Sequence, residues 1–513
     1  MENNLSYATG YPNPMASKEE KEKLEFGIQY FKKMYSDWNS DNNSLLNIKS
    51  QRYDRTRKYS RGLQSVNKYK NLINSSGDTS YLNLDWTVIP IISKFVDVLV
   101  GSLTNQDYKI LCNAIDSVST EKRREDKMNM ATDIMIKGFA AQLTEASGIP
   151  MGAQEGAPET NEELELHMQL NYKQSIEIAL EQGIELAFSI NDWEEISRRL
   201  IRDLVDINIG ATKTYLDANG IGIRYVDPKY LVTSHSKHPN FQDLLHVGEI
   251  RQITIQELKR IAGTQFTEEE YRDMAESYVS KNGNPTSLTA SNIGYTFEVE
   301  KFTVDILDAE FKSVDIMHYE KKENKYGGYT INKKNSRYKA PKKSKYKREQ
   351  VKPQIETWYS GKWVIGTDYI FDYGLKENML RPKNNLARTL GSYTVYSNNA
   401  TRGINHAYIH LMEGVANRTA LALQDLVKYK GPYSGYISAL GETNMKTVNI
   451  TKEISPIEVG IKIEALPDEI EMELLEQNIQ QSLAQKELRI EDAIMIRNIK
   501  NIKLANQMLI LRR

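Results

Sequence analysis

The stretch TRGINHAYIHLMEGVANRTALALQDLVKYKGP (401–432) decides the fold, because it predicts one long helix. Its apolar residues recur at spacings of three, four or seven, which places them on a single helical stripe. These residues are Ile404, Tyr408, Leu411, Val415, Ala422 and Leu426. Lys428 and Lys430 suit the negative end of the helix dipole, and Gly431 with Pro432 ends the helix. About thirty residues give a rod of about 45 Å.

Two stretches before this helix alternate apolar and polar residues, as strands with one buried face do. They are YTFEVEKFTVDILDAEFKSVDIMHYE (295–320) and QIETWYSGKWVIGTDYIFDYG (354–374). From about residue 296 the sequence therefore predicts a small β-rich insertion, and the chain leaves this insertion through the long helix.

The segment NKKNSRYKAPKKSKYKR (332–348), which we call the basic segment, lies between those predicted strands. Nine of its seventeen residues are Lys or Arg and none is acidic, whereas the whole chain carries a formal net charge of −1. The nine are Lys333, Lys334, Arg337, Lys339, Lys342, Lys343, Lys345, Lys347 and Arg348. Clustered cations with interleaved tyrosines are typical of a surface that contacts phosphates without reading base sequence. A solvated loop, or a docking surface for an acidic protein, explains the same pattern.

The first half of the chain is predicted to be mainly helical. A basic arm over 51–62 ends at Gly62, and alternating residues around a DANG turn predict strands over 211–234. Asp192 is the expected cap of the helix over 192–210, and Gly210 its stop. Helices are predicted over 17–38, over 86–103, up to about 144, and over 161–191, 192–210, 253–263 and 267–279. A last helical stretch over 468–513 reaches Arg513 without a cap, so we expect the chain to continue.

The length of 513 residues allows roughly three domain-sized units. A single cysteine, Cys112, excludes an internal disulfide framework and fits a reducing compartment. The most apolar run, 86–103, is interrupted by Pro90, Lys94 and Asp97. It therefore predicts a buried helix rather than a membrane span.

Patterns that indicate catalysis or metal binding are weak. NIGATKTY (208–215) lacks the glycines of a phosphate-binding loop. Cys112 is expected to be a small apolar strand residue, and Asp305 and Asp308 lie on a strand without convergent partners. The histidines fall into two groups: His235, His238 and His246, and His406, His410 with Glu413. His406 and His410 have the four-residue spacing of a zinc protease motif, but Ala407 stands where that motif has Glu. No catalytic residue, metal ligand or cofactor is predicted.

The order of these parts resembles that of the portal proteins of tailed bacteriophages, and is most similar to the portals of crAss-like phages. The stretches that carry the resemblance are WTVIPIISKFVDVLVGSLTNQDYKI (86–110), NYKQSIEIALEQGIELAFSINDWEEISRRLIRDLV (171–205) and IRYVDPKYLVTSHSKHPNFQDLLHVGEIRQITIQELKR (223–260). The resemblance covers most of the chain, although portal motifs are diffuse patterns.

The resemblance implies an α+β, mainly α, portal fold and a structural, non-enzymatic protein of the virion, assembled in the host cytoplasm. It implies a dodecameric ring at one capsid vertex, through which double-stranded DNA passes during packaging and ejection. The implied partners are the major capsid protein, the terminase, head–tail adaptor ring proteins and non-specifically bound DNA, with no membrane. In a ring, Ile404, Tyr408, Leu411, Val415 and Leu426 would form the interface of the stem helix with neighbouring subunits.

The resemblance also implies a division of the chain. A wing covers 1–245 and 431–470, a first stem segment 246–295, a β-rich clip 296–390, a second stem helix 391–430, and a helix toward a crown 471–513. Two other classes of protein remain as alternatives. One is another head–tail connector or adaptor, which the length disfavours. The other is a nucleic-acid enzyme, which the missing phosphate-binding loop disfavours.

Overall fold

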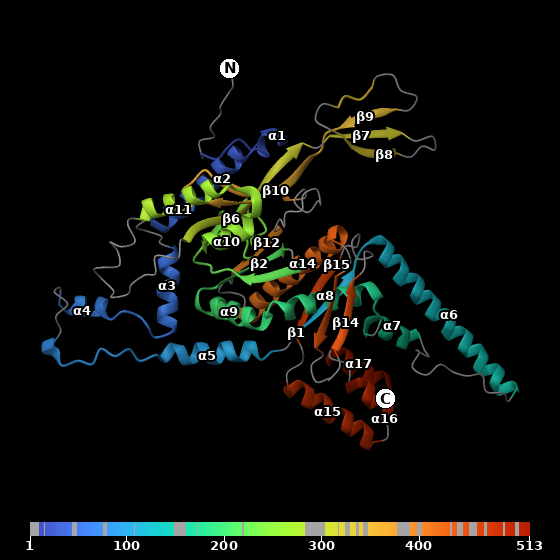
Figure 1. The fold of residues 1–513 in the computed structure, drawn as a ribbon. Coiled ribbons are helices and arrows are strands. Elements are labelled where there is room, and N and C mark those ends of the chain that lie inside the picture. Colours follow the sequence, from blue (N-terminus) through green and yellow to red (C-terminus); the bar gives the residue numbers. More distant parts are fainter. Residues whose placement is uncertain are drawn as a thin grey trace. The chain divides into compact units, whose positions relative to one another are not determined.

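The computed structural model describes most of the chain (Figure 1). The described residues are 10–14, 16–43, 49–74, 80–106, 108–147, 161–170, 172–217, 220–282, 303–316, 318–323, 329–334, 338–341, 347–376, 390–397, 403–430, 433–438, 445–450, 459–465, 469–485, 488–497 and 502–512. The fold is mixed, with more helix than strand, which confirms the predicted α+β, mainly α, class. Within the described residues, no helix combines the length and the apolar character needed to cross a membrane.

The chain forms two compact units, each built from two separate stretches of sequence. Unit 1 contains Met1–Val96 and Arg202–Ala407, and unit 2 contains Asp97–Ile201 and Tyr408–Arg513. Three helices cross the boundary between these stretches: α5 (Ile91–Thr104), α9 (Trp193–Asp206) and α14 (Ile404–Lys430).

Unit 1 contains three described antiparallel sheets. The largest has the strand order β11-β10-β6-β5-β4, the second β12-β2-β3, and the third β8-β7-β9. The strands are β2 (Ile209–Asp217), β3 (Gly220–Tyr225), β4 (Leu231–Thr233), β5 (His246–Thr254), β6 (Thr303–Ile316), β7 (His318–Glu323), β8 (Tyr329–Lys334), β9 (Arg348–Val351), β10 (Gln354–Val364), β11 (Ile370–Leu375) and β12 (Leu390–Ser397). The hairpin of β2 and β3 confirms the strands predicted around the DANG turn, since Asp217 pairs with Gly220.

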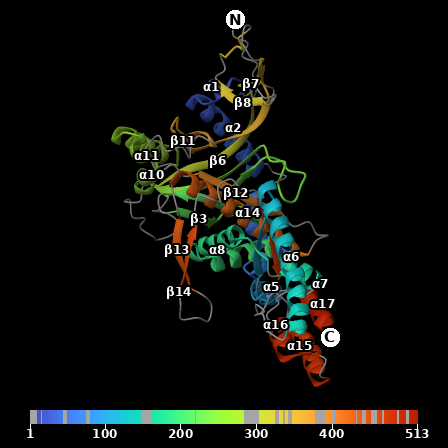
Figure 2. The same cartoon turned by 90° about the vertical axis from the view of Figure 1, so that its right-hand side faces the viewer.

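Helices of unit 1 cover both faces of the largest sheet, and β6 shows why. Its residues alternate between faces, as strand geometry requires. Leu307 and Phe311 pack with Phe31 of α2, whereas Val304 and Ile306 pack with residues of α10 and α11 on the other face. The ribbons of α2, α10 and α11 lie around β6 in Figures 1 and 2. The described helices are α1 (Lys18–Lys21), α2 (Leu24–Asn43), α3 (Lys49–Ser60), α4 (Asn67–Ile73), η1 (Ser80–Leu82), α10 (Ile255–Ala262), η2 (Gly263–Gln265) and α11 (Glu268–Asn282).

A buried ion pair fixes α1 to this sheet. Lys21 Nζ donates to Asp315 Oδ1 at 3.0 Å, and neither side chain is exposed to solvent. The hydroxyls of Thr357 and Tyr359 donate to Asp315 Oδ2 at 2.9 and 2.8 Å. Every oxygen of this buried carboxylate therefore has a partner, which is the condition for keeping a charge in a core.

Unit 2 is mainly helical and holds two small described sheets. The strand β1 (Tyr108–Ala114) pairs with β15 (Val459–Ala465), and β13 (Tyr433–Ser438) pairs with β14 (Met445–Ile450). Its remaining helices are α6 (Ser117–Ser147), α7 (Asn161–Leu170), α8 (Ser175–Ile190), α15 (Glu469–Ala484), α16 (Ile490–Arg497) and α17 (Ile502–Arg512). The last three pack together around Leu475, Ile479 and Ile496.

Several predicted helices exist with different bounds. The helix predicted over 17–38 is two helices, α1 and α2. The one predicted over 161–191 is also two, since α8 begins anew where Gln174 N–H donates to the Glu177 carboxylate at 2.9 Å. The stretch after residue 468 forms three helices rather than one. Apolar periodicity continued through these breaks, so it could not locate them.

Gly210 does not end the helix predicted over 192–210. The helix α9 ends at Asp206, and Asn208 adopts the left-handed conformation with φ of 60° that terminates many helices. Gly210 instead lies inside β2, where it pairs with Tyr396. Asp192 directly precedes α9 and its carbonyl accepts the N–H of Ile196, but its backbone has φ of 50° and its side chain makes no capping hydrogen bond among the described contacts.

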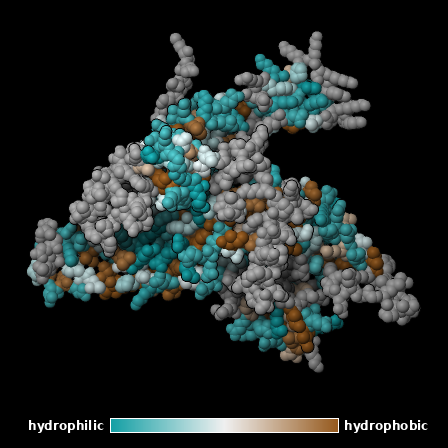
Figure 3. All heavy atoms as spheres, in the orientation of Figure 1, coloured by the Kyte–Doolittle hydropathy of each residue, from teal (hydrophilic) through white to brown (hydrophobic). Residues whose placement is uncertain are grey.

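The predicted burial of the apolar run 86–103 is wrong. The helix begins only at Ile91, after Pro90, whose ring suits the start of a helix and whose missing N–H prevents an earlier one. Phe95 is 72% exposed and Val98 is 73% exposed, while Val100 and Leu103 are buried. Hydrophobic residues gather along this stretch in Figure 3.

Candidate functional site

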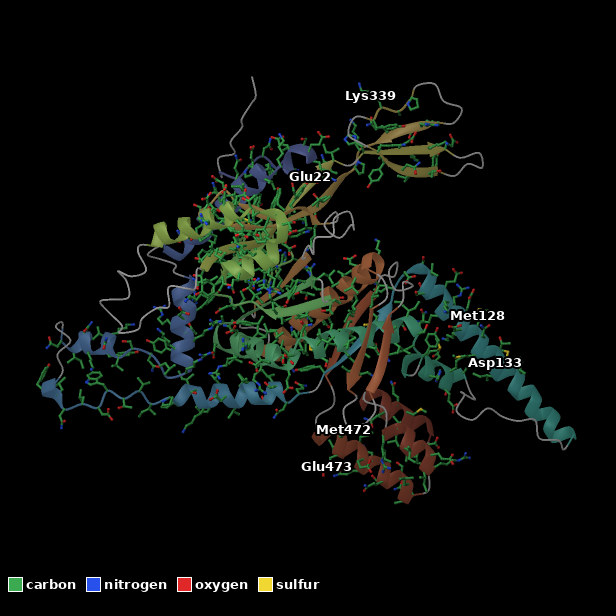
Figure 4. All side chains as sticks on the ribbon, in the orientation of Figure 1. Glu22, Met128, Asp133, Lys339, Met472 and Glu473 are labelled. Carbon is green, nitrogen blue, oxygen red and sulfur yellow. The ribbon has the colours of Figure 1, made fainter. Side chains whose placement is uncertain are left out.

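The basic segment joins two strands of the small sheet β8-β7-β9. It begins within β8 and ends at the first residue of β9, and β7 lies between these two strands. This small sheet is inserted between β6 and β10. The sequence predicted a small β-subdomain that included the strands β6 and β10, but these two strands belong to the largest sheet of unit 1, together with β5 and β4. Figure 4 labels Lys339 on the part of the segment that is described between the two strands.

One acidic side chain anchors this segment. Glu320, in the middle of β7, is 3% exposed. Tyr338 Oη and Arg348 Nη1 donate to its Oε1 at 2.6 and 3.1 Å, and Lys334 Nζ lies 3.2 Å from its Oε2. The hydrogen bond from Tyr338, with the charges of Lys334 and Arg348, holds the pKa of Glu320 below its usual range.

A second contact fixes the same part of the segment. Gln350 Nε2, in β9, donates to the carbonyl of Tyr338 at 2.6 Å. The ring of Tyr338 also lies under Lys334, with 5.4 Å from Nζ to the ring centroid. These contacts fix the two ends of the segment, at Lys334 with Tyr338 and at Arg348.

The nine predicted cations divide by position. Lys339 and Lys347 are exposed, and Lys347 pairs with Glu349 at 2.7 Å. Lys334 and Arg348 are half-buried against Glu320. The backbone of Lys333 lies in β8, and Arg337, Lys342, Lys343 and Lys345 lie outside the described residues. The exposed Lys339 and Lys347 can bind an anion, whereas Lys334 and Arg348 hold the segment to Glu320.

The predicted stem helix exists as α14, but most of its stripe is covered within the chain. Tyr408, Leu411, Val415 and Leu426 are buried, and Ile404 is half-buried. The Tyr408 ring packs against Tyr108 of β1 with centroids 5.4 Å apart. These four side chains therefore belong to the core of the chain itself, and their predicted contact with neighbouring subunits stays a prediction.

Cys112 lies in β1 and is fully buried, as the sequence predicted. Burial and the nearby Glu181 raise the pKa of its thiol to about 12. A thiol that stays protonated and has no access to solvent is a poor nucleophile.

Asp308 has convergent partners, contrary to the sequence prediction. Lys213 of β2 reaches across from the second sheet, with its Nζ 2.5 Å from Asp308 Oδ2, and Arg224 of β3 lies 3.8 Å from the same oxygen. Although burial raises the pKa of Asp308, Lys213, Lys362 and Arg224 outweigh it and hold the pKa below its ordinary value.

The same cluster continues along the sheet. Arg224 also pairs with Glu249, and Lys362 Nζ lies 2.7 Å from Asp372 Oδ2. Asp308 is 7% exposed and Lys213 is 5% exposed, so the cluster braces two sheets internally and offers no open site. The sequence carried no signal for it, because Lys213 and Asp308 meet only through tertiary packing.

The histidine groups do not assemble into a described metal site. His235 and His238 are exposed, whereas His246 is buried against the rings of Tyr11 and Tyr30. His410 Nδ1 lies 3.0 Å from Glu413 Oε2, and the two residues are neighbours on one face of α14. Across the described ranges, no three His, Cys, Asp or Glu side chains are grouped so that they could hold a metal ion.

The sequence comparisons leave the family of this chain open. No protein-family model matches the sequence, and a search of the curated proteins found no match.

Proposed function

We propose that this protein is the portal of a tailed bacteriophage, a structural ring that conducts double-stranded DNA into and out of the capsid. The observation that carries the proposal is the order of parts. Helical regions surround a β-rich insertion with an anchored basic segment, and the chain leaves the insertion through the 27-residue helix α14.

In this proposal the protein forms a dodecameric ring at one capsid vertex, in contact with the major capsid protein. The sheet β8-β7-β9 belongs to the clip, which docks the terminase during packaging and the head–tail adaptor proteins afterwards. A ring repeats the exposed Lys339 and Lys347 in every subunit, so that even one cation per chain becomes a charged collar. Such a collar suits non-specific contact with DNA phosphates or with an acidic face of a partner ring.

The burial of two potentially reactive groups, the thiol of Cys112 and the carboxylate of Asp308, supports a structural role. The thiol of Cys112 is buried and protonated, and the carboxylate of Asp308 is neutralised by cations inside the fold. Neither group is available to a substrate. Another head–tail connector protein is the second candidate, because it would share the ring and the basic collar.

The test is the assembly state and position of the full chain. Negative-stain images and mass measurement of the purified protein should show closed twelve-fold rings with a central channel. Antibody labelling of virions should mark the capsid vertex rather than the tail. A persistent monomer or an open fibre would refute the ring, and labelling below the capsid would favour the connector.

A further inference from the structure

The helix α3 has one face that is tied to its own unit by ion pairs. Arg57 Nη2 donates to Asp203 Oδ1 at 2.9 Å and to Asp227 Oδ1 at 3.0 Å. One turn earlier, Asp54 Oδ2 accepts from Lys229 Nζ at 2.7 Å. Because Arg57 and Asp54 are satisfied within the chain, this face holds the helix in a fixed orientation.

The end of α3 is fixed as well. The N–H of Leu63 donates to the carbonyl of Lys58 at 2.8 Å, and the N–H of Gly62 donates to that of Tyr59 at 3.2 Å. This pair of bonds, with Gly62 at φ of 69°, forms a Schellman cap. A Cβ at Gly62 would lie 2.6 Å from Pro90 Cβ, so a close backbone approach also requires glycine here.

Four exposed cations, which we call the α3 row, occur along this part of the chain: Arg52, Arg55 and Lys58 on α3, and Arg61 directly after it. Because each step of three residues turns by about 300°, the row winds around the helix instead of lying along a single face. The four are exposed and recur every third residue. Among the residues that the structure describes, none of the four has an ion-pair partner. The sequence from 49 to 70 holds eight basic residues and one acid, Asp54, which is already paired with Lys229. The charge of the row is therefore not neutralised by nearby side chains.

A neighbouring helix extends the same surface. The Tyr59 and Tyr69 hydroxyls lie 3.4 Å apart and bring α4 beside the end of α3. Lys68 of α4 is exposed. The cations of α3 and α4 therefore form one continuous basic surface.

We propose that the α3 row binds the phosphate backbone of double-stranded nucleic acid without reading its sequence. Arginine presents several donors in a plane that matches phosphate oxygens. From Arg52 to Arg61 the row spans about 14 Å, comparable to about four base-pair steps of one DNA strand.

An acidic protein is a less suitable occupant, for a reason visible in the helix. On α3 itself, between residues 52 and 61, no large apolar side chain is exposed, and the exposed apolar residues nearby, Leu63, Leu72 and Ile73, lie after the row. Protein interfaces usually need buried apolar or aromatic anchors in their centre, whereas binding to phosphates needs only cations. The α3 row is separate in sequence from the basic segment, and its proposal does not depend on the portal ring.

The test measures binding of the full chain to a fluorescein-labelled 30-base-pair DNA duplex of mixed sequence. We compare the unaltered protein with the triple variant Arg52→Gln, Arg55→Gln and Lys58→Gln by fluorescence anisotropy over a range of NaCl concentrations. Glutamine keeps helix propensity while removing charge. The plot of log affinity against log salt should be shallower by about 3 for the variant. Since such plots converge near 1 M salt, the variant should bind about 500-fold more weakly at 0.1 M salt.

The matched control is Lys122→Gln, Arg124→Gln and Lys127→Gln on α6, where Glu121 and Glu125 alternate with the cations. It removes the same charge and should keep the affinity and the salt slope of the unaltered protein. Equal losses in both triple variants would reduce the effect to net charge and overturn the proposal. Polyglutamate that competes as well as unlabelled duplex, charge for charge, would assign the surface to an acidic protein instead.

Discussion

At the scale of single residues, the buried imidazole of His246 makes stability depend on pH. Burial lowers its pKa to about 4, although Asp37 opposes this shift. The folded protein therefore keeps His246 neutral at pH values where the unfolded chain protonates it. Between pH 6.5 and 4 the unfolded state binds more protons, so stability falls as the pH falls, by up to about 3 kcal/mol.

The variant His246→Phe should lose this part of the pH dependence, because phenylalanine can fill the same site between Tyr11 and Tyr30 without titrating. Denaturant unfolding at several pH values between 4 and 7 measures the free energy of unfolding and how it depends on pH. His235→Phe, which removes an exposed imidazole, is the control. If both variants keep the pH dependence of the free energy of unfolding that the unaltered protein shows, His246 does not cause this dependence.

At the same scale, the sequence could predict residues whose neighbours along the chain define them. Cys112 as a strand residue is an example. It could not predict that Asp308 faces Lys213, because two sheets must pack before those charges meet. The anchoring role of Glu320 was hidden because β7, β8 and β9 must pair into one sheet before its partners surround it.

At the scale of elements, the basic segment depends on Glu320. The variant Glu320→Gln removes the negative charge that holds Lys334, Tyr338 and Arg348, while keeping the shape of the side chain. We expect hydrogen exchange in β8 and β9 to become several-fold faster, since these strands then lose charge-assisted bonds. Tryptic cleavage in residues 332–348 should increase in parallel.

Acid should have the same effect on the unaltered protein. Because the pKa of Glu320 is lowered in the folded state, its contribution is present above the unfolded pKa and is lost as pH falls through the lower folded value. Glu349→Gln, beside exposed Lys347, is the control. Unchanged exchange and cleavage in Glu320→Gln would show that the strands hold the segment without this anchor.

Elements also show where sequence periodicity succeeds and fails. It located α14 within a few residues, because its apolar stripe is long and is ended by Gly431 and Pro432. It overestimated the length of helices at 17–38 and 161–191, where local capping interrupts an unbroken apolar pattern. It also predicted burial for α5 from apolar content alone, and apolar content says nothing of what covers a helix.

At the scale of the whole molecule, each unit assembles from stretches that are far apart in the sequence. In unit 2, β1 pairs with β15 over seven consecutive residue pairs. In unit 1, α1 is fixed to β6 by the ion pair of Lys21 and Asp315. Pairings of this range leave no trace in local patterns, so the division into wing, stem and clip that the resemblance implies could not be checked from the sequence.

Because each unit has a core of its own, we predict that the two units unfold in separate transitions. Phe311 lies in a core of unit 1, and Ile479 lies in the core of α15, α16 and α17 in unit 2. Truncating either buried side chain to alanine should cost about 2–5 kcal/mol in its own unit. In calorimetry, Phe311→Ala and Ile479→Ala should each lower the midpoint of a different transition.

Hydrogen exchange assigns the transitions, because protection should fall in residues 303–316 for Phe311→Ala and in residues 469–512 for Ile479→Ala. The control is Leu421→Ala on α14, which removes as many atoms as Ile479→Ala; Leu421 is 54% exposed, so this substitution should shift neither midpoint appreciably. One transition that both core variants lower equally would mean that the chain unfolds as a single cooperative body.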